Sequence, residues 1–114
     1  MIRVVFWEEE GRWRGFELKG HAGYRPEGRD IVCAAVSSLA QTVALGLLHH
    51  LPGGLRLKKK KGYLRCFLSL ESMGEEDRIR AQTLLTTLFL GLEAISRDYG
   101  KYVRIKRKSF KGKG

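Results

Sequence analysis

Residues that favour β-strands cluster in five short stretches, several with hydrophobic side chains at every second position, and this pattern predicts strands. The stretches cover residues 2–8, 12–19, 55–61, 63–70 and 102–107. Gly11 separates the first two stretches and Gly62 the next two, and a glycine at such a point is typical of a hairpin turn. The pattern therefore predicts two hairpins and one further strand near the C-terminus.

The apolar stretch 31–51 predicts a long helix. Asp30 precedes it as an N-cap, since its carboxylate can accept backbone N–H bonds, and Pro52 with the two glycines after it ends the helix. Residues 31–48 carry no charge, and about 18 apolar residues is the length at which a membrane span must be considered. The polar side chains gather on one side of such a helix: Ser37, Ser38, Gln41 and Thr42. We therefore expect a helix buried in a compact core, and no membrane contact.

A second helix is predicted from about residue 72 to Tyr99. Ser72 and Glu75 have the spacing of a capping box, and Gly100 follows the last turn. Helical spacing also relates a stripe of apolar residues that we expect to face the core: Ala81, Leu84, Leu85, Leu88, Leu92 and Ile95.

The predicted order of elements is ββαββαβ. A chain of 114 residues is long enough for one domain, and we expect a single domain over residues 1–114. The simplest architecture for this order is an α+β fold, in which two helices pack against a mixed β-sheet of about five strands. Each half of the chain is a hairpin followed by a helix, but the two halves are too different in sequence to indicate a duplication.

The formal net charge of +10 is concentrated in two basic strips. Residues 55–65 contain six Lys or Arg residues, residues 101–114 contain seven, and neither strip contains an acid. The rest of the chain contains the other nine bases and all twelve acids, so it carries a net charge of −3. Such strips are compatible with contacts to RNA or ribosomal phosphate, and equally with a solvated strand face and a solvated tail.

The chain contains two cysteines, which is too few for a disulfide scaffold. Its first residues read MIRVVFWEEE, and because charges interrupt them we expect no signal peptide. We therefore expect a cytoplasmic protein with both thiols reduced. Cys66 alternates with leucines in a predicted strand, so we expect it in the core.

Cys33 and His21 are the candidate reactive pair. With Asp30 as N-cap, Cys33 falls in the first helical turn, where backbone N–H groups without helical partners favour a thiolate and can hold an oxyanion. Histidine titrates near neutral pH, so His21 is suited to accept and return the thiol proton. Ser37 lies one turn further along the same helix face, as a hydrogen-bonding or a packing residue.

The same residues also have simpler interpretations. A lone cysteine in an apolar run is most often a core residue, and a lone loop histidine is most often a surface residue. The adjacent His49 and His50 point in different directions on a helix, so no metal site is expected. Nothing in the sequence indicates a phosphate-binding loop or another cofactor site.

The block from Gly20 to Ser38, which reads GHAGYRPEGRDIVCAAVSS, resembles the signature of the bacterial ribosomal-processing cysteine protease family called Prp. The match includes Gly20-His21-Ala22 and the run from Asp30 to Ser37, and the length and element order of the whole chain also agree. The resemblance implies an endopeptidase whose Cys-His dyad is Cys33 and His21. It also implies a supporting role for Asp30 and Ser37.

In that family the enzyme removes an N-terminal extension from a large-subunit ribosomal protein, family members are dimeric, and the loop after the histidine gates the site. The resemblance therefore implies the same substrate, a homodimer and no cofactor for this chain. The corresponding gating residues here are Gly20, Ala22, Gly23, Tyr24 and Gly28. A lid rich in glycine suits a site that closes on its substrate.

Two other functions remain open on the sequence. The basic strips are also compatible with a non-catalytic RNA- or ribosome-binding module, and the dyad with a different cysteine hydrolase. For a peptidase that acts on a basic ribosomal protein, we expect the strips to lie away from the Cys33 cleft.

Overall fold

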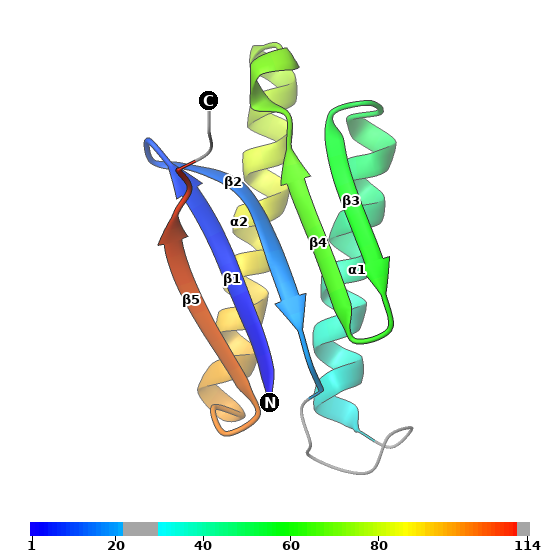
Figure 1. Cartoon of the computed structure of the whole chain (residues 1–114), viewed down its shortest axis with the longest axis vertical. Coiled ribbons are helices and arrows are strands. Elements are labelled where there is room, and N and C mark those ends of the chain that lie inside the picture. The colour runs from blue at the N-terminus through cyan, green and yellow to red at the C-terminus, as the bar shows by residue number, and fades with distance from the viewer. Residues whose placement is uncertain (22–29, 112–114) are drawn as a thin grey trace.

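The computed structural model describes residues 1–21 and 30–111, and it has the predicted α+β architecture with a five-stranded mixed sheet (Figure 1). The order ββαββαβ is confirmed, with one short 3-10 turn added before the second helix. The elements are β1 (Ile2–Glu9), β2 (Arg12–Lys19), α1 (Ile31–His50), β3 (Leu55–Lys60), β4 (Tyr63–Leu68), the 3-10 turn Leu70–Ser72, α2 (Glu75–Asp98) and β5 (Val103–Ser109).

The strands lie in the order β3-β4-β2-β1-β5. Three pairs of neighbours are antiparallel, and β1 and β5 are parallel, so the first and last strands lie side by side. Glu8 of β1 also accepts two hydrogen bonds from the Arg107 guanidinium of β5, at 2.9 and 3.0 Å, and this contact lowers the pKa of the Glu8 carboxyl. Because β3 and β5 are the edge strands, the two basic strips lie at opposite edges of the sheet, one in β3 and β4 and the other in β5.

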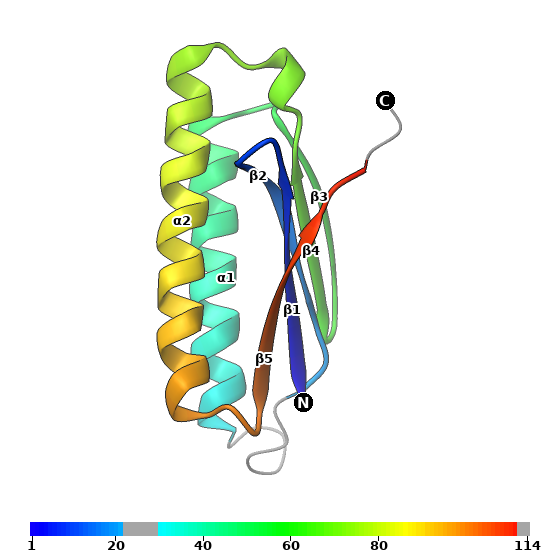
Figure 2. The same ribbon diagram turned by 90° about the vertical axis from the view of Figure 1, so that its left-hand side faces the viewer.

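Both helices cover the same face of the sheet (Figure 2). The core between the two layers is formed by the inward side chains of the strands, such as Phe6, Phe16 and Leu18, and by a buried stripe on each helix. On α2 this stripe is Ala81, Leu85, Leu88 and Leu92, four of the six residues that the sequence pattern predicted. Burial of this contiguous apolar surface is the main source of stability in a domain of this size.

α1 is buried on one side only. Val32, Val36, Ala40, Ala44 and Leu47 pack into the core, but only 33% of its most apolar 18-residue window is buried. Among residues 1–21 and 30–111 it is the one helix long and apolar enough to cross a membrane, judged by length and composition. The prediction of a helix buried in a compact core is therefore correct for one face, and the opposite face is exposed and uncharged.

α2 begins three residues later than its sequence signals predict. Gly74 is its N-cap, and Ser72 belongs to the 3-10 turn, where its hydroxyl donates to the Ser69 carbonyl at 2.9 Å. The capping box is therefore absent. Three acidic residues in the first turn, Glu75, Glu76 and Asp77, instead complement the positive end of the helix.

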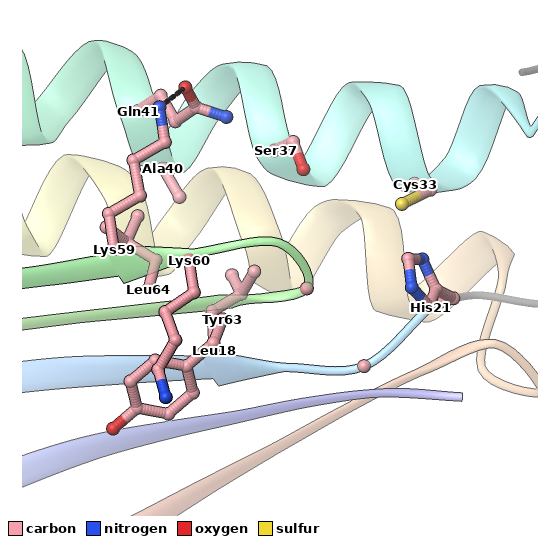
Figure 3. Close-up of a pocket in the computed structure, with 12 residues that line it drawn as sticks. Leu18, His21, Cys33, Ser37, Ala40, Gln41, Lys59, Lys60, Tyr63 and Leu64 are labelled. Atoms are coloured by element: carbon pink, nitrogen blue, oxygen red, sulfur yellow. Dashed lines mark hydrogen bonds between the residues drawn. The ribbon is translucent and has the colours of Figure 1, made fainter.

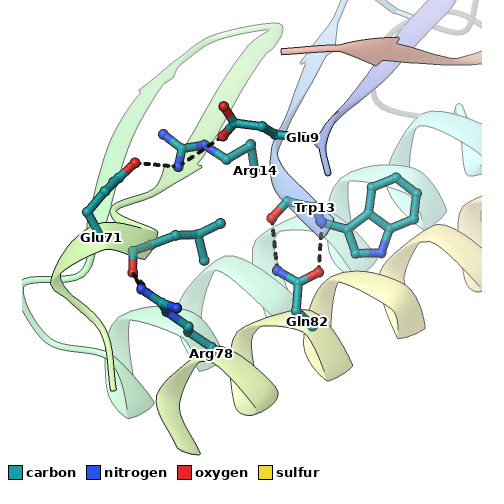
Figure 4. Close-up of polar contacts among 7 residues, drawn as sticks. Glu9, Trp13, Arg14, Glu71, Arg78 and Gln82 are labelled. Atoms are coloured by element: carbon teal, nitrogen blue, oxygen red, sulfur yellow. Dashed lines mark hydrogen bonds and ion pairs between the residues drawn. The ribbon is translucent and has the colours of Figure 1, made fainter. Parts of the chain in front are cut away.

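A side-chain amide joins α2 to the sheet (Figure 4). Gln82 Oε1 accepts from the Trp13 backbone N–H at 2.7 Å, and Gln82 Nε2 donates to the Trp13 carbonyl at 2.9 Å. This contact lies beside an irregularity in the β1–β2 ladder, where the pairing register shifts between Trp7 and Glu8. The amide therefore bonds backbone groups of β2 as a neighbouring strand would.

Candidate active site

Cys33 lies in the first turn of α1, and Asp30 caps that turn as predicted. The Asp30 carboxylate accepts a hydrogen bond from the Cys33 backbone N–H at 2.9 Å, and its own carbonyl accepts from the Ala34 N–H at 3.0 Å. The Cys33 side chain is partly buried. Because the carboxylate already occupies the Cys33 amide, this amide does not serve as the oxyanion donor in the observed arrangement.

His21 follows the end of β2, with Gly20 between them. The backbone conformation at Gly20 is one that only glycine adopts easily. Gly20 has a φ of +95°, and a Cβ built on it would lie 2.6 Å from the Met1 carbonyl oxygen. Its N–H donates to the Gly62 carbonyl at 2.9 Å, which ties the end of β2 to the β3–β4 turn. The His21 ring then packs on that turn, with Nε2 3.4 Å from the position of a Cβ on Gly62.

The structure brings Cys33 and His21 to the same hollow, and Figure 3 shows the Cys33 sulfur facing the His21 ring. The hollow has a volume of about 130 Å³ and lies between α1 and the β3–β4 hairpin. Its walls are formed by Leu18, Gly20, His21, Cys33, Ser37, Ala40, Gln41, Lys59, Lys60, Gly62, Tyr63 and Leu64. A half-buried thiol beside an exposed imidazole is an arrangement suited to nucleophilic attack on a carbonyl.

The helix wall of the hollow presents polar side chains at four-residue spacing. Ser37 and Gln41 follow Cys33 at intervals of one helical turn, so all three lie on one face (Figure 3). Gln41 Oε1 accepts a hydrogen bond from Lys59 Nζ at 2.8 Å. This bond orients the Gln41 amide, and its nitrogen remains available as a donor along the hollow.

The opposite wall comes from the first basic strip, which corrects one expectation. We expected residues 55–65 to lie away from the Cys33 cleft, but Lys59, Lys60 and Tyr63 line it. The reason is the sheet register: β2 pairs with β4 so that Lys19 lies opposite Tyr63, and the β3–β4 turn therefore lies beside His21. The second strip lies at the far edge of the sheet, with β5.

The second thiol has the surroundings expected of a core residue. Cys66 has no exposed surface, and burial raises the pKa of its thiol to about 12. It therefore stays protonated and inert at neutral pH, in contrast to the accessible Cys33.

Some candidate residues are absent from the hollow or from the described part of the chain. His49 and His50 lie at the other end of α1 with ring centroids 4.9 Å apart. Among the residues that the structure describes, no group of three or more His, Cys, Asp or Glu side chains gathers to hold a metal. The predicted gating residues after His21 lie outside the described residues: Ala22, Gly23, Tyr24 and Gly28.

Several residues that line the hollow were not singled out from the sequence as part of the site, among them Gln41, Lys59 and Tyr63. The sequence does contain a signal for Gln41: it continues the four-residue spacing of Cys33 and Ser37, which places all three residues on one helix face. Lys59 and Tyr63 have no local signal, since their positions depend on which strands pair and in which register.

Comparisons with known proteins agree with this geometry. The family model described as cysteine protease Prp matches residues 1–104. The ribosomal processing cysteine protease Prp of Bacillus subtilis (strain 168) is 34% identical over 92 residues, which are 79% of this chain and 81% of that protein.

Solved structures share the fold. The essential ribosomal processing protease Prp from S. aureus, in complex with a covalently linked product peptide, has a TM-score of 0.79 at 23% identity, over 95% of this chain and 100% of that chain. SMU.848 from Streptococcus mutans has a TM-score of 0.72 at 27% identity, over 96% of each chain.

Proposed function

Since the chain belongs to the family of the cysteine protease Prp and is therefore a peptidase, we propose that Cys33 is its nucleophile and His21 its general base and acid. The observation that supports this assignment is their shared hollow, in which the sulfur faces the imidazole. Cys66 is fully buried in the core between the sheet and the helices and is not available for the same role.

The proposed reaction has two stages. His21 accepts the Cys33 thiol proton as the sulfur attacks the carbonyl carbon of the scissile peptide bond, and His21 then gives that proton to the leaving amine. A thioester between Cys33 and the N-terminal part of the substrate remains. His21 next accepts a proton from water as the oxygen attacks the thioester, and the released thiolate takes the proton back.

Asp30 and Ser37 have supporting roles in this proposal. The Asp30 carboxylate holds the first turn of α1 through the Cys33 amide, so it is a positioning residue for the nucleophile. The Ser37 hydroxyl lies on the same helix face as Cys33 and is the proposed hydrogen-bond donor to a substrate carbonyl.

The hollow suits an extended peptide. Gln41 follows Cys33 by eight positions, which is about 12 Å along a helix, or about three to four residues of extended chain. In this proposal the Gln41 amide, which Lys59 orients, bonds a backbone group of the substrate. From the relatives, which are named as ribosomal processing proteases, we propose that the substrate is the N-terminal extension of a bacterial large-subunit ribosomal protein, cleaved in the cytoplasm.

A peptide that spans the junction between such an extension and the mature protein tests the dyad. Cys33→Ala and His21→Ala should each lower kcat/KM by at least about 10³-fold, because either change removes the activated nucleophile. Cleavage is followed by mass spectrometry of both products. The matched control is Cys66→Ala, which removes the other thiol and should retain cleavage. Retained cleavage in the Cys33→Ala protein would refute the assignment.

We also propose that residues 1–114 form one cysteine protease domain that works as a homodimer. One continuous core cluster connects β1 to β5, which supports a single folding unit. The outward face of α1 supports self-association, because Ile31 is 58% exposed and Leu45 67% exposed, and the helix carries no Lys, Arg, Asp or Glu. Two copies of such a face can pack without bringing like charges together.

A further inference from the structure

The sheet has a second face that the proposed peptidase does not use. α1 and α2 cover one side, and in the described part of the chain no helix or strand covers the other (Figure 2). We call this side the open sheet face; it carries the outward side chains of all five strands, including Arg3 and Trp7 of β1, Arg65 and Phe67 of β4 and Lys106 of β5.

Cationic side chains line two hollows on the open sheet face. The hollow over β1 and β5 has a volume of about 400 Å³, and its cations are Arg3, Arg104, Lys106 and Lys108. The hollow over β3 and β4 has a volume of about 280 Å³, and its cations are Arg56, Lys58 and Arg65. Neither hollow has an acidic residue in its lining. The positive charge of both basic strips therefore lies on one surface, with a gap between the two hollows over β2.

Aromatic rings extend across that gap, from Trp7 of β1 to Phe67 and Phe110, which also line the hollow over β3 and β4. The ring centroids of Trp7 and Phe67 are 6.2 Å apart, and those of Phe67 and Phe110 are 5.4 Å apart. Gly15 makes the first contact possible, because by register it lies between Trp7 and Phe67 and has no side chain to separate them. We call these three rings the aromatic ridge.

Cations also lie directly over the ridge. The Arg65 guanidinium is 4.7 Å from the centre of the Phe67 ring, Arg14 is 4.8 Å from that of Phe110, and Lys108 Nζ is 5.7 Å from that of Trp7. A guanidinium stacked on an aromatic ring offers a flat, positively charged platform, and nucleobases stack on both kinds of surface.

Cations outnumber acids on this face. Among the residues that the structure describes, seven Lys or Arg residues line the two hollows, and the acids near them are Glu17 of β2 together with Glu9 and Glu71, which pair with Arg14 at 3.5 and 2.9 Å. Glu17 lies opposite Arg65 in the sheet, and it accepts a hydrogen bond from the Tyr63 hydroxyl at 2.6 Å, which raises the pKa of that phenol. A second copy of the chain does not suit the open sheet face, because two such faces would bring like charges together. A partner of negative charge with flat apolar groups suits it well.

We propose that the open sheet face binds single-stranded RNA, with phosphates in the two cationic hollows. Bases stack along the aromatic ridge on the half-buried Trp7 and Phe110 rings and on the exposed Arg65 guanidinium, which covers the buried Phe67 ring. Four interstrand spacings separate β5 from β3, so the hollows are about 20 Å apart at most, a span that a short single-stranded segment can cross. The Cys33 hollow lies between α1 and the β3–β4 hairpin, so RNA binding and peptide cleavage use separate surfaces.

The test measures binding of a fluorescein-labelled 12-nucleotide single-stranded RNA by anisotropy between 50 and 200 mM KCl. The double variants Arg104→Gln/Lys106→Gln and Arg56→Gln/Lys58→Gln each remove two cations from one hollow. Each should weaken binding about tenfold and reduce the slope of log K against log salt by about one to two, because fewer counterions are released. Trp7→Leu should weaken binding at least about fivefold and leave the slope unchanged, because it removes stacking and no charge.

The matched control is Arg80→Gln/Arg97→Gln, which removes the same charge from exposed positions on α2 and should change affinity less than twofold. Cys33→Ala should bind RNA with the affinity of the unchanged protein. The RNA-binding result therefore does not depend on whether Cys33 and His21 are the catalytic residues. Equal loss of affinity in the α2 control would overturn the proposal.

Other polyanions provide the remaining outcomes. If heparin competes as well as RNA and Trp7→Leu has no effect, the face attracts any polyanion and the RNA proposal is wrong. If vesicles of phosphatidylcholine and phosphatidylserine at 7:3 bind through the same cations while RNA does not, the partner is an anionic membrane and the proposal is equally wrong.

Discussion

At the scale of single residues, two cysteines in one small domain differ because of where the backbone places them. Cys33 lies in the first turn of a helix and lines a hollow, whereas Cys66 points into the core between leucines of β4. Burial raises the pKa of the Cys66 thiol to about 12, so its reactive thiolate is rare at neutral pH. One thiol is therefore chemically available and the other is a packing residue.

Alkylation of the folded protein should reveal this difference. At pH 7.5 iodoacetamide should modify Cys33 at least about 100-fold faster than Cys66, because the reagent needs an accessible thiolate. Intact-mass and peptide mass spectrometry over a time course measure both rates. In urea the two rates should become similar, and faster labelling of Cys66 in the folded protein would contradict the structure.

At the scale of elements, the contact between β2 and β4 depends on one glycine. A Cβ on Gly15 would lie 2.3 Å from the Cys66 carbonyl oxygen and 2.8 Å from the Phe67 Cα. No side chain fits there unless the two strands move apart. The same position also allows Trp7 and Phe67 to meet across β2, so the strand pairing and the aromatic ridge share this requirement.

Two glycine-to-alanine substitutions should therefore have opposite effects on stability. Gly15→Ala should lower the free energy of unfolding by about 1–3 kcal/mol, as expected for overpacking between strands. Gly46→Ala is the control, because its Cβ would meet only Leu84 Cδ1 at 3.8 Å and alanine favours a helix. Urea denaturation followed by circular dichroism measures both, and an unchanged midpoint for Gly15→Ala would refute the argument.

The elements themselves were largely predictable from the sequence, and their arrangement was not. The alternation of apolar residues located the strands, and Asp30 marked the start of α1, because both signals act over a few residues. The Lys59 side chain in the wall of the hollow depends on contacts between strands far apart in sequence, which no local pattern contains. Cys33 and His21 were predictable as a pair only through the family resemblance, since their proximity also depends on the β2–β4 register.

At the scale of the whole molecule, the two outer surfaces differ sharply in charge. The exposed side of α1 has no charged residue, while the open sheet face carries the cations of both basic strips. The first surface suits a second copy of the chain, and the second suits a polyanion. A dimer joined through α1 would leave both open sheet faces accessible.

A charge placed on α1 should test the proposed dimer. Leu45→Lys should shift the protein from dimer to monomer in sedimentation velocity experiments at micromolar concentration, because pairing would bury two ammonium groups without partners. Ile79→Lys is the control, since Ile79 is 58% exposed on α2 and lies outside the proposed interface. A monomeric unchanged protein, or dimers in both variants, would refute pairing through α1.

The parallel pairing of β1 with β5 also determines when folding can finish during synthesis. Glu8 and its partner Arg107 are 99 residues apart, so the ribosome must add nearly the whole domain before the outer edge of β1 can be covered. Chains emerge N-terminus first at about 5–20 residues per second, which leaves this edge unpaired for several seconds. An unpaired edge is open to other strands, and the nascent chain therefore has its greatest need of a chaperone just before β5 is made.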